Sequence, residues 1–431
     1  MTAAQIISLL VLVSVVAALI QGKLRSDVVA LAGAAVLLVT RTVRPVEVQA
    51  AFASPAIIAL AALFVIAYAM ELSGLLGLLV RGATRLCARL GAAGLWIVIA
   101  LAGAASAFLN NTPIVVLAGP VVRDVAESMK LSPKRFLIPL SYVTILGGAC
   151  TLIGTSTNLL VNDMARNAGQ PAFGMFEITP VALIVAVAGG VYLFLFGNRL
   201  LSAGPSDAPE ADNVRVEEAA LTDDPSLFPA DQLLHPVKAL TALAVFGLVV
   251  AAAALGLAPI AATAFAGAVL LVLTRVISVE EAYRGLRPEV LFLIAGMVVV
   301  GLSLEVTGLA KVATDLLVVW VQSLGPLVAL ALIYGATLFL TEILSNAAVA
   351  VLLTPVAVAL AESLGVSPRP FLIGVMMAAS AAFATPFGYQ TNVLVYQLGR
   401  YRYLDFVKIG VPLNLLTWAV GVGVIPRFFP F

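Results

Sequence analysis

Two stretches of the chain place consecutive amide and hydroxyl side chains inside long apolar runs. They are Asn110-Asn111-Thr112 and its echo Ser345-Asn346-Ala347. An unpaired polar group that faces lipid costs several kcal/mol, so these side chains must face protein, water or a ligand. Thr112 followed by Pro113 is also the favoured order for a helix start, which predicts a re-entrant hairpin with its tip inside the membrane. The positive end of the second arm's dipole would favour a bound anion there.

Two further clusters interrupt apolar runs with glycine and then restart a helix. They are Gly154-Thr155-Ser156-Thr157-Asn158 and Thr385-Pro386-Phe387-Gly388-Tyr389-Gln390-Thr391-Asn392. Such a break frees backbone carbonyls on one side and aims amide groups from the other. At membrane depth it is tolerated only where it lines a cavity or is buried in protein. Carbonyls, amide oxygens and hydroxyls are hard neutral ligands that suit a weakly held Na⁺, whereas a transition metal would need His or Cys ligands that these clusters lack.

One tip and one break in each half predict two Na⁺ sites that flank one anion site. The alternative is that these residues only cap helices and join them by modest hydrogen bonds. The expected sodium ligands are Asn111, Gly154, Asn158, Asn346, Gly388 and Asn392. The expected substrate ligands are Asn110, Asn111, Thr112, Thr157, Ser345, Asn346 and Thr391. Glu342 lies one helical turn before Asn346. Two roles are open for its carboxylate: binding a proton or cation, or making a structural hydrogen bond.

The elements that must hold these clusters are membrane helices. With 431 residues, 62% hydrophobic and 11% charged, the composition predicts an all-α polytopic membrane protein. A net charge of +1 without a long basic run argues against a nucleic-acid partner. Residues 3–21 follow no Lys or Arg, so we expect a retained first span instead of a signal peptide. Neither a cofactor nor an enzymatic activity is expected, because the spans offer no Ser/His or paired-Asp set.

The second half of the chain repeats the first. Leu131–Ile138 matches Val366–Ile373 at a displacement of 235 positions, which also carries Asn111 onto Asn346. A displacement of 234 carries Thr157–Val161 onto Thr391–Val395. These matches predict an N-terminal repeat over 1–197, an acidic linker over 198–236 and a C-terminal repeat over 237–431.

Each repeat is expected to contain about five transmembrane helices and one hairpin that returns to its own side. The odd number of crossings would invert the second repeat, with broken helices meeting at the midplane. The positive-inside rule supports this topology with both termini outside, the linker cytoplasmic and the protein in the cell (inner) membrane. Of the 24 Lys and Arg residues, only six would then lie outside: Arg41, Arg44, Arg166, Lys311, Arg369 and Arg427.

These motifs resemble the divalent anion/sodium symporter family of the ion transporter superfamily, whose hairpins carry Ser-Asn-Thr twice. Phe108–Pro113, Thr151–Val161 and Pro386–Asn392 are similar to its bacterial and algal sulfate permeases. The resemblance implies a homodimer with a scaffold domain and a transport domain that holds both hairpins and moves like an elevator. Those relatives carry a soluble regulatory insert between the halves, which residues 198–236 replace here, so regulation through it is not expected.

The resemblance favours Na⁺-coupled symport of a small divalent oxyanion, sulfate first. Na⁺-coupled dicarboxylate symport is the alternative, although Ala347 lacks the hydroxyl of the third motif position and Asn110 replaces Ser. A Na⁺/H⁺ antiporter or arsenite-type exporter would need a titratable residue at the tips, which neither tip supplies. A channel would need a charged ring or filter repeat.

The predicted topology can be tested by labelling. In a background without Cys87 and Cys150, an Arg215→Cys variant should react with an impermeant thiol reagent only from the cytoplasmic side, because the linker is expected there. A cysteine beside residue 2 should react only from outside and serves as the matched control. Labelling of residue 215 from outside would rule out the inverted-repeat topology.

Overall fold

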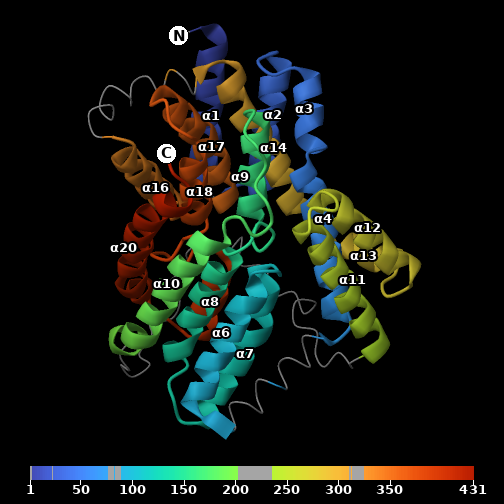
Figure 1. Ribbon diagram of the computed structural model, residues 1–431, viewed down its shortest axis with the longest axis vertical. Helices are drawn as coiled ribbons and strands as arrows, with labels where there is room; N and C mark the ends of the chain where they lie inside the picture. Colours follow the sequence, from blue (N-terminus) through green and yellow to red (C-terminus); the bar gives the residue numbers. More distant parts are fainter. Residues whose placement is uncertain are drawn as a thin grey trace.

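A computed structural model of the chain describes residues 2–21, 23–75, 82, 89–201, 235–309, 312 and 325–431 (Figure 1). Within these ranges the regular secondary structure is helical, and the predicted apolar runs form helices. The first half contains α1 (Ala3–Gln21), α2 (Ser26–Val39), α3 (Pro45–Phe52), α4 (Pro55–Leu72), α6 (Ala92–Ser106), α7 (Asn111–Ser128), α8 (Lys134–Gly148), α9 (Ser156–Asn167) and α10 (Thr179–Leu200). The second half contains α11 (Pro236–Ala254), α12 (Ile260–Leu273), α13 (Val279–Gly285), α14 (Pro288–Val306), α16 (Pro326–Thr341), α17 (Asn346–Ser363), α18 (Arg369–Ala379), α19 (Gln390–Leu398) and α20 (Tyr403–Phe428).

Some residues on which the topology depends lie outside these ranges. They are Arg81, Arg85, Cys87, Arg215, Lys311 and the linker over 202–234. The orientation of the repeats and of both termini therefore stays a prediction.

Six stretches are long and apolar enough to cross a membrane, by length and composition, so the chain is a polytopic membrane protein. They are Pro45–Leu72, Thr179–Gly197, Pro236–Ala254, Pro288–Val306, Asn346–Ser363 and Tyr403–Phe428. Further apolar helices of 10–17 residues accompany them, among them α2, α6, α12 and α16. Of these, α6 and α16 end where the hairpin tips interrupt the apolar runs.

Two short helices, α3 and α13, are absent from the sequence prediction because neither gives a long apolar run. They occupy matched positions in the two halves. At the start of α13, Ser278 Oγ accepts a hydrogen bond from Glu281 N (3.1 Å), and the Glu281 carboxylate accepts one from Ser278 N (2.7 Å). This capping box is a sequence signal that could have located the helix.

The helices form two groups, and each group takes elements from both halves. Group one contains α1–α4 and α11–α14, with α2 packed on α14 and α4 packed on α12. Group two contains α6–α10 and α16–α20, with α10 packed on α20 and α9 packed on α17. In Figure 1, α4, α11, α12 and α13 lie to the right, away from α10, α16 and α20 on the left. The helix pairs α14–α17 and α4–α9 join the two groups.

Within group two the first hairpin, α6 and α7, lies in the lower part of Figure 1, and the second, α16 and α17, lies in the upper part.

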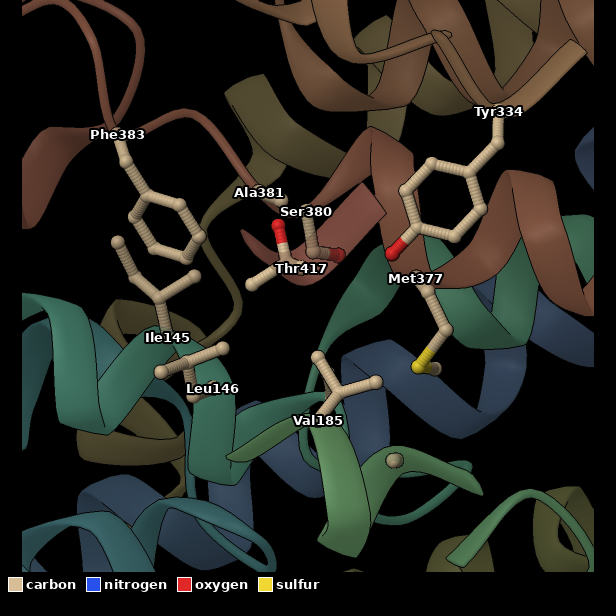
Figure 2. Close-up of a pocket in the computed structure, with 11 residues that line it drawn as sticks. Ile145, Leu146, Val185, Tyr334, Met377, Ser380, Ala381, Phe383 and Thr417 are labelled. Carbon is tan, nitrogen blue, oxygen red and sulfur yellow. The ribbon is translucent and has the colours of Figure 1, made fainter. Parts of the chain in front are cut away.

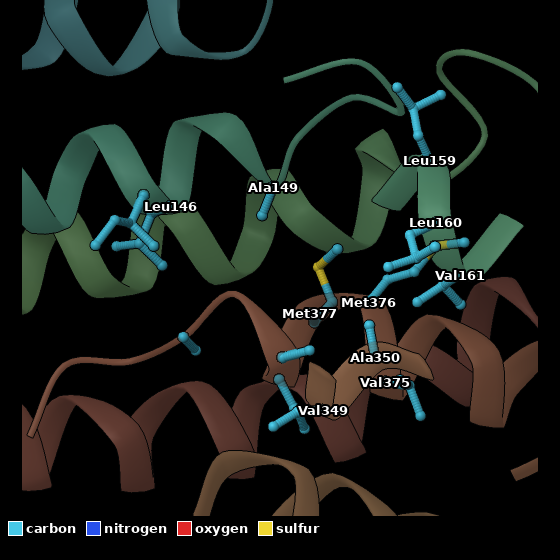
Figure 3. Packing of buried hydrophobic residues seen from close by; sticks show 14 of the residues in the cluster. Leu146, Ala149, Leu159, Leu160, Val161, Val349, Ala350, Val375, Met376 and Met377 are labelled. Atoms are coloured by element: carbon cyan, nitrogen blue, oxygen red, sulfur yellow. The ribbon is translucent and has the colours of Figure 1, made fainter. Parts of the chain in front are cut away.

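Apolar side chains fill the space where the halves meet. Leu160 and Val161 of α9 lie near Val349 and Ala350 of α17 and Val375 of α18, and all five are buried (Figure 3). Group two is therefore held together by contacts between the halves.

Helices α6 and α8 approach each other so closely that glycine is required. A Cβ atom added at Gly147 would lie against the backbone carbonyl of Gly103, at a distance that atoms in proteins do not tolerate. Small residues at such crossings let membrane helices pack backbone to backbone. This close packing fixes the start of the first break relative to the first hairpin.

We therefore expect Gly147→Ala to destabilise the protein by about 1–3 kcal/mol or more, because the new methyl group forces α6 and α8 apart. Gly190→Ala in α10 is the matched control, since nothing lies within 4 Å of its added Cβ. The control should be neutral or stabilising by about 0.4–1 kcal/mol. Thermal unfolding of the purified variants measures both, and equal melting temperatures would contradict the packing argument.

Candidate functional site

The first hairpin turns between Ser106, where α6 ends, and Asn111, where α7 begins. Its N-cap is Asn110, whose side-chain oxygen accepts a hydrogen bond from Thr112 N (3.4 Å). The prediction that Thr112 caps this helix is wrong. Asn is at least as good a cap as Thr, and Pro113 then falls in the first turn, where its missing N–H costs nothing.

The second hairpin turns between Thr341 and Asn346 in the same way. Ser345 is the N-cap of α17, and its hydroxyl accepts a hydrogen bond from Ala348 N (3.4 Å). Thr341 Oγ1 donates to Asn346 Oδ1 (2.8 Å). The first tip repeats this bond, because Ser106 Oγ donates to Asn111 Oδ1. Each tip asparagine is thus fixed by a hydroxyl from the preceding arm.

The first break runs from the end of α8 at Gly148 to the start of α9 at Ser156. Asn158 closes it, because its Nδ2 donates to Ala149 O (3.4 Å) and to Thr151 O (2.9 Å). The amide therefore satisfies carbonyls that the unwound backbone exposes.

The second break runs from the end of α18 at Ala379 to the start of α19 at Gln390. Asn392 has the same role as its counterpart, since its Nδ2 donates to Ala382 O (2.7 Å) and to Thr385 O (3.2 Å). Both asparagines are buried. One side-chain amide thus holds each unwound segment.

Each tip touches the break of its own half through an equivalent contact. Thr151 Oγ1 donates to Ala107 O in the first half, and Thr385 Oγ1 lies 3.3 Å from Glu342 O in the second. Residue 342 is matched to residue 107 by the displacement of 235. The predicted pairing of one tip with one break therefore holds in both halves.

Backbone oxygens gather at the first tip–break junction. A Cβ atom added at Gly154 would lie 2.8 Å from Ala107 O and 2.9 Å from Ser106 O, and it would also meet Gly148 O. A Cβ atom added at Gly148, where the break begins, would lie 2.5 Å from Asn111 Oδ1. Several neutral oxygens therefore approach one point, and only glycine leaves room there. This is the donor set that a weakly held alkali cation uses.

The polar groups of the two halves also meet. Asn111 Nδ2 donates to Tyr389 Oη (2.8 Å), and Thr112 Oγ1 donates to Gln390 Oε1 (3.2 Å). The first tip is therefore bonded to the start of α19, in the second break. The tip and break residues of both halves form one polar centre in group two.

Ser141 of α8 makes a further contact across the halves. Its Oγ lies 2.8 Å from Thr391 Oγ1 and 2.7 Å from Asn392 Oδ1. The residue matched to Ser141 in the second half is Met376, which has no hydroxyl. Asn158 Oδ1 is correspondingly buried without a hydrogen-bond partner among the described residues. This oxygen is a free acceptor in the first half.

Burial separates the predicted site residues into two sets. The first set is enclosed: Asn111, Thr157, Asn158, Thr391 and Asn392. The second set is half-buried: Asn110, Thr112, Ser345 and Asn346. These four tip side chains are therefore the ones that a dissolved ligand can reach first.

A hollow lies between the first junction and group one. Its polar surface comes from Asn110, Gly154 and Ser156, and the opposite wall is apolar. The remaining lining residues are Leu60, Leu63, Phe64, Ala67, Phe108, Leu109, Ile153 and Phe246. The hollow brings the tip and the break to the boundary between the two helix groups.

A second cavity lies inside group two, next to the second break (Figure 2). The buried hydroxyls of Tyr334 and Ser380 line it, and neither has a hydrogen-bond partner among the described residues. Met377, Phe383 and Ile145 make most of the wall apolar. Because it lies within the core and holds none of the predicted ligands, we assign it to packing.

Several polar residues of this centre have no role in the sequence prediction. Ser106 and Thr341 could have been found, because the displacement of 235 places a hydroxyl at both positions. Ser141 could not, because its contacts join segments 250 positions apart. The residues without a predicted role are Ser106, Ser141, Thr151, Ser156, Thr341, Thr385, Tyr389 and Gln390.

Two hairpin tips that meet two broken helices in a polytopic helical protein define a secondary transporter. The citrate transporter family matches residues 15–365 and 348–430, and the chain belongs to that family. The predicted resemblance to divalent anion/sodium symporters is thereby confirmed.

Individual relatives agree with this assignment. An uncharacterised transporter of Synechocystis sp. is 26% identical, over 90% of this chain and 91% of that protein. Their alignment spans 565 positions, so the relative contains residues that this chain of 431 lacks. Probable sodium/sulfate cotransporter 3 of Chlamydomonas reinhardtii is 42% identical over 108 residues, which are 23% of this chain and 12% of that protein. The YdaH transporter of Alcanivorax borkumensis has a similar fold, with a TM-score of 0.60 at 15% identity over 88% of this chain and 86% of that chain.

Proposed function

We propose that the protein is a Na⁺-coupled symporter of a small divalent oxyanion, with sulfate as the substrate. The observation that carries the proposal is the pair of tip–break junctions, where oxygen atoms converge without a basic side chain. The ion pairs of the described residues are Arg25–Asp27, Arg44–Glu47, Arg123–Asp124 and Arg369–Glu177, and none of them includes a tip or break residue. A divalent anion bound there would need helix N-termini and co-bound cations to balance its charge.

The cation part of the proposal assigns one Na⁺ to each junction. Asn111, Gly154 and Asn158 would serve the first, and the free acceptor Asn158 Oδ1 supports that assignment. Asn346, Gly388 and Asn392 would serve the second. A transition metal is not supported, because the described residues contain no group of three His, Cys, Asp or Glu that could hold one.

The anion part places the substrate between the two tips. Helices α7 and α17 both begin there, so their unpaired N–H groups and positive dipole ends would face the anion. Asn110, Thr112 and Ser345 are half-buried and would donate from the tips. Thr391 is less suited to this role than predicted, because it is fully buried against Ser141.

For the transport cycle we propose that group two moves against group one as an elevator. Both tips and both breaks belong to group two, so substrate and cations would travel together. The hollow beside Asn110 lies at the boundary between the groups, where such a movement would open the site to one side and then the other. The family resemblance implies that the protein is a homodimer, and in this proposal group one is its scaffold domain.

Uptake into proteoliposomes tests the coupling. Labelled sulfate should accumulate only with an inward Na⁺ gradient. Asn111→Ala and Asn346→Ala should each abolish this uptake, because each removes a cation ligand and the partner of an arm hydroxyl. Thr241→Ala is the matched control, since its exposed hydroxyl bonds only Val237 O in group one. Equal uptake with and without the gradient, or wild-type uptake by both asparagine variants, would refute the proposal.

A carboxylate substrate is the second candidate, and the name of the matched family, citrate transporter, favours it. The tips argue against it. Thr112 is matched to Ala347, so the first tip has a hydroxyl where the second has a methyl group. A compact tetrahedral anion needs donors around one point, whereas a dicarboxylate of four carbons needs donors at both ends. A site that is built to hydrogen-bond its ligand rejects other molecules that leave its buried donors unpaired.

Competition between the two substrates distinguishes these candidates. We expect excess succinate or citrate to reduce sulfate uptake only weakly. Ala347→Thr should improve the competition by succinate, because it restores a hydroxyl at the second tip. Succinate uptake by the unmodified protein that equals or exceeds sulfate uptake would make the carboxylate the substrate.

A further inference from the structure

The two junctions differ at one matched position. Glu342 caps the C-terminus of α16 at the second junction, and Ala107 caps α6 at the first. The backbone has the same position at both, since each carbonyl lies within hydrogen-bond distance of the threonine hydroxyl of its break. The difference is therefore confined to the side chain, a carboxylate in place of a methyl group.

The Glu342 carboxylate is surrounded by hydrogen-bond donors. Its Oε1 accepts from Phe383 N (2.9 Å), Ala384 N (2.8 Å) and Asn414 Nδ2 (2.7 Å). Its Oε2 accepts from Thr385 Oγ1 (2.9 Å). Three of these groups can only donate, and all three bond Oε1. Donors in this arrangement favour the ionised carboxylate, which accepts and does not donate.

This negative charge lacks a basic partner in the described part of the chain. The four ion pairs there do not include Glu342. The residue is half-buried within a protein that crosses a membrane. A charge in such a place normally has a counter-charge, because hydrogen bonds alone do not offset the free-energy cost of removing the charge from water.

The free side of the carboxylate faces the second junction. A Cβ atom added at Gly388 would lie 2.9 Å from Thr385 Oγ1 and 3.4 Å from Glu342 Oε2. Oε2 accepts one hydrogen bond among the described residues, so it keeps lone pairs on the side where Gly388 lies. A cation beside the Gly388 backbone would thus lie within a few Å of a full negative charge.

We propose that Glu342 supplies the counter-charge for the cation at the second junction, which makes the two junctions unequal. The inference rests on the proposed Na⁺ coupling and deepens it. The first junction holds its cation with neutral oxygens alone. The second adds a carboxylate, whose attraction at this distance is strong even at the effective dielectric constant of a partly buried site. The second junction therefore fills at a lower Na⁺ concentration than the first, before the anion binds.

Glu342→Gln tests the charge with little change in shape. The Gln carbonyl oxygen can keep the three hydrogen bonds of Oε1, and its amide can donate to Thr385 Oγ1. Na⁺ binding is measured without anion as the rise in melting temperature of the purified protein, with choline keeping the ionic strength constant. The half-saturating Na⁺ concentration should rise by about tenfold or more in this variant. Asn414→Ala, which removes a donor and keeps the charge, should change it by less than about threefold.

A second variant makes the test independent of how well Glu342→Gln folds. Ala107→Glu places a carboxylate at the first junction and should lower the Na⁺ concentration that half-saturates sulfate uptake. Wild-type Na⁺ dependence in both charge variants would overturn the inference and leave Glu342 as a structural hydrogen-bond acceptor. Absence of any Na⁺ effect on the stability and uptake of the wild-type protein would instead refute the proposed coupling itself.

Discussion

The structure depends on how it satisfies the backbone of two helices that break inside an apolar protein. Unwound peptide groups at membrane depth need partners, and no water is available from lipid. Asn158 and Asn392 provide them, each with one amide that bridges two carbonyls of its own break. The unwound segments can therefore keep one ordered conformation. Their remaining oxygens and the capped tips become available for ligands, so the same constraint that stabilises the fold also creates the site.

Duplication explains why the tips and breaks occur twice and why the two junctions differ. The matched bonds from Ser106 and Thr341 to the tip asparagines show that both repeats keep one framework. Substitutions within that framework then change single groups. Met376 in place of Ser141 leaves one asparagine oxygen free, and Glu342 in place of Ala107 adds a charge. Two similar junctions can in this way acquire different affinities while one fold carries both.

The sequence allows much of the fold to be predicted, because apolar runs and a constant displacement are strong signals. The tips and breaks were predictable for the same reason, since polar residues there occur at matched positions. Other features depend on contacts between distant segments. The bond from Ser141 to Asn392 and the one from Asn111 to Tyr389 join the two halves, and no local pattern indicates them. The cap at Asn110 was missed because Thr112 before Pro113 is an equally good local signal. The proposed function rests mainly on the resemblance to a known family, and the family match supports that resemblance.

The central claim is that the two tip–break junctions bind cations on either side of one anion. A cryo-EM structure of the protein in Na⁺ and sulfate, compared with one in choline chloride, tests it most directly. The account predicts Na⁺-dependent density at both junctions, beside Gly154 and beside Gly388, and anion density between the N-termini of α7 and α17. Density for the anion elsewhere, or junctions that look the same in Na⁺ and in choline, would contradict it.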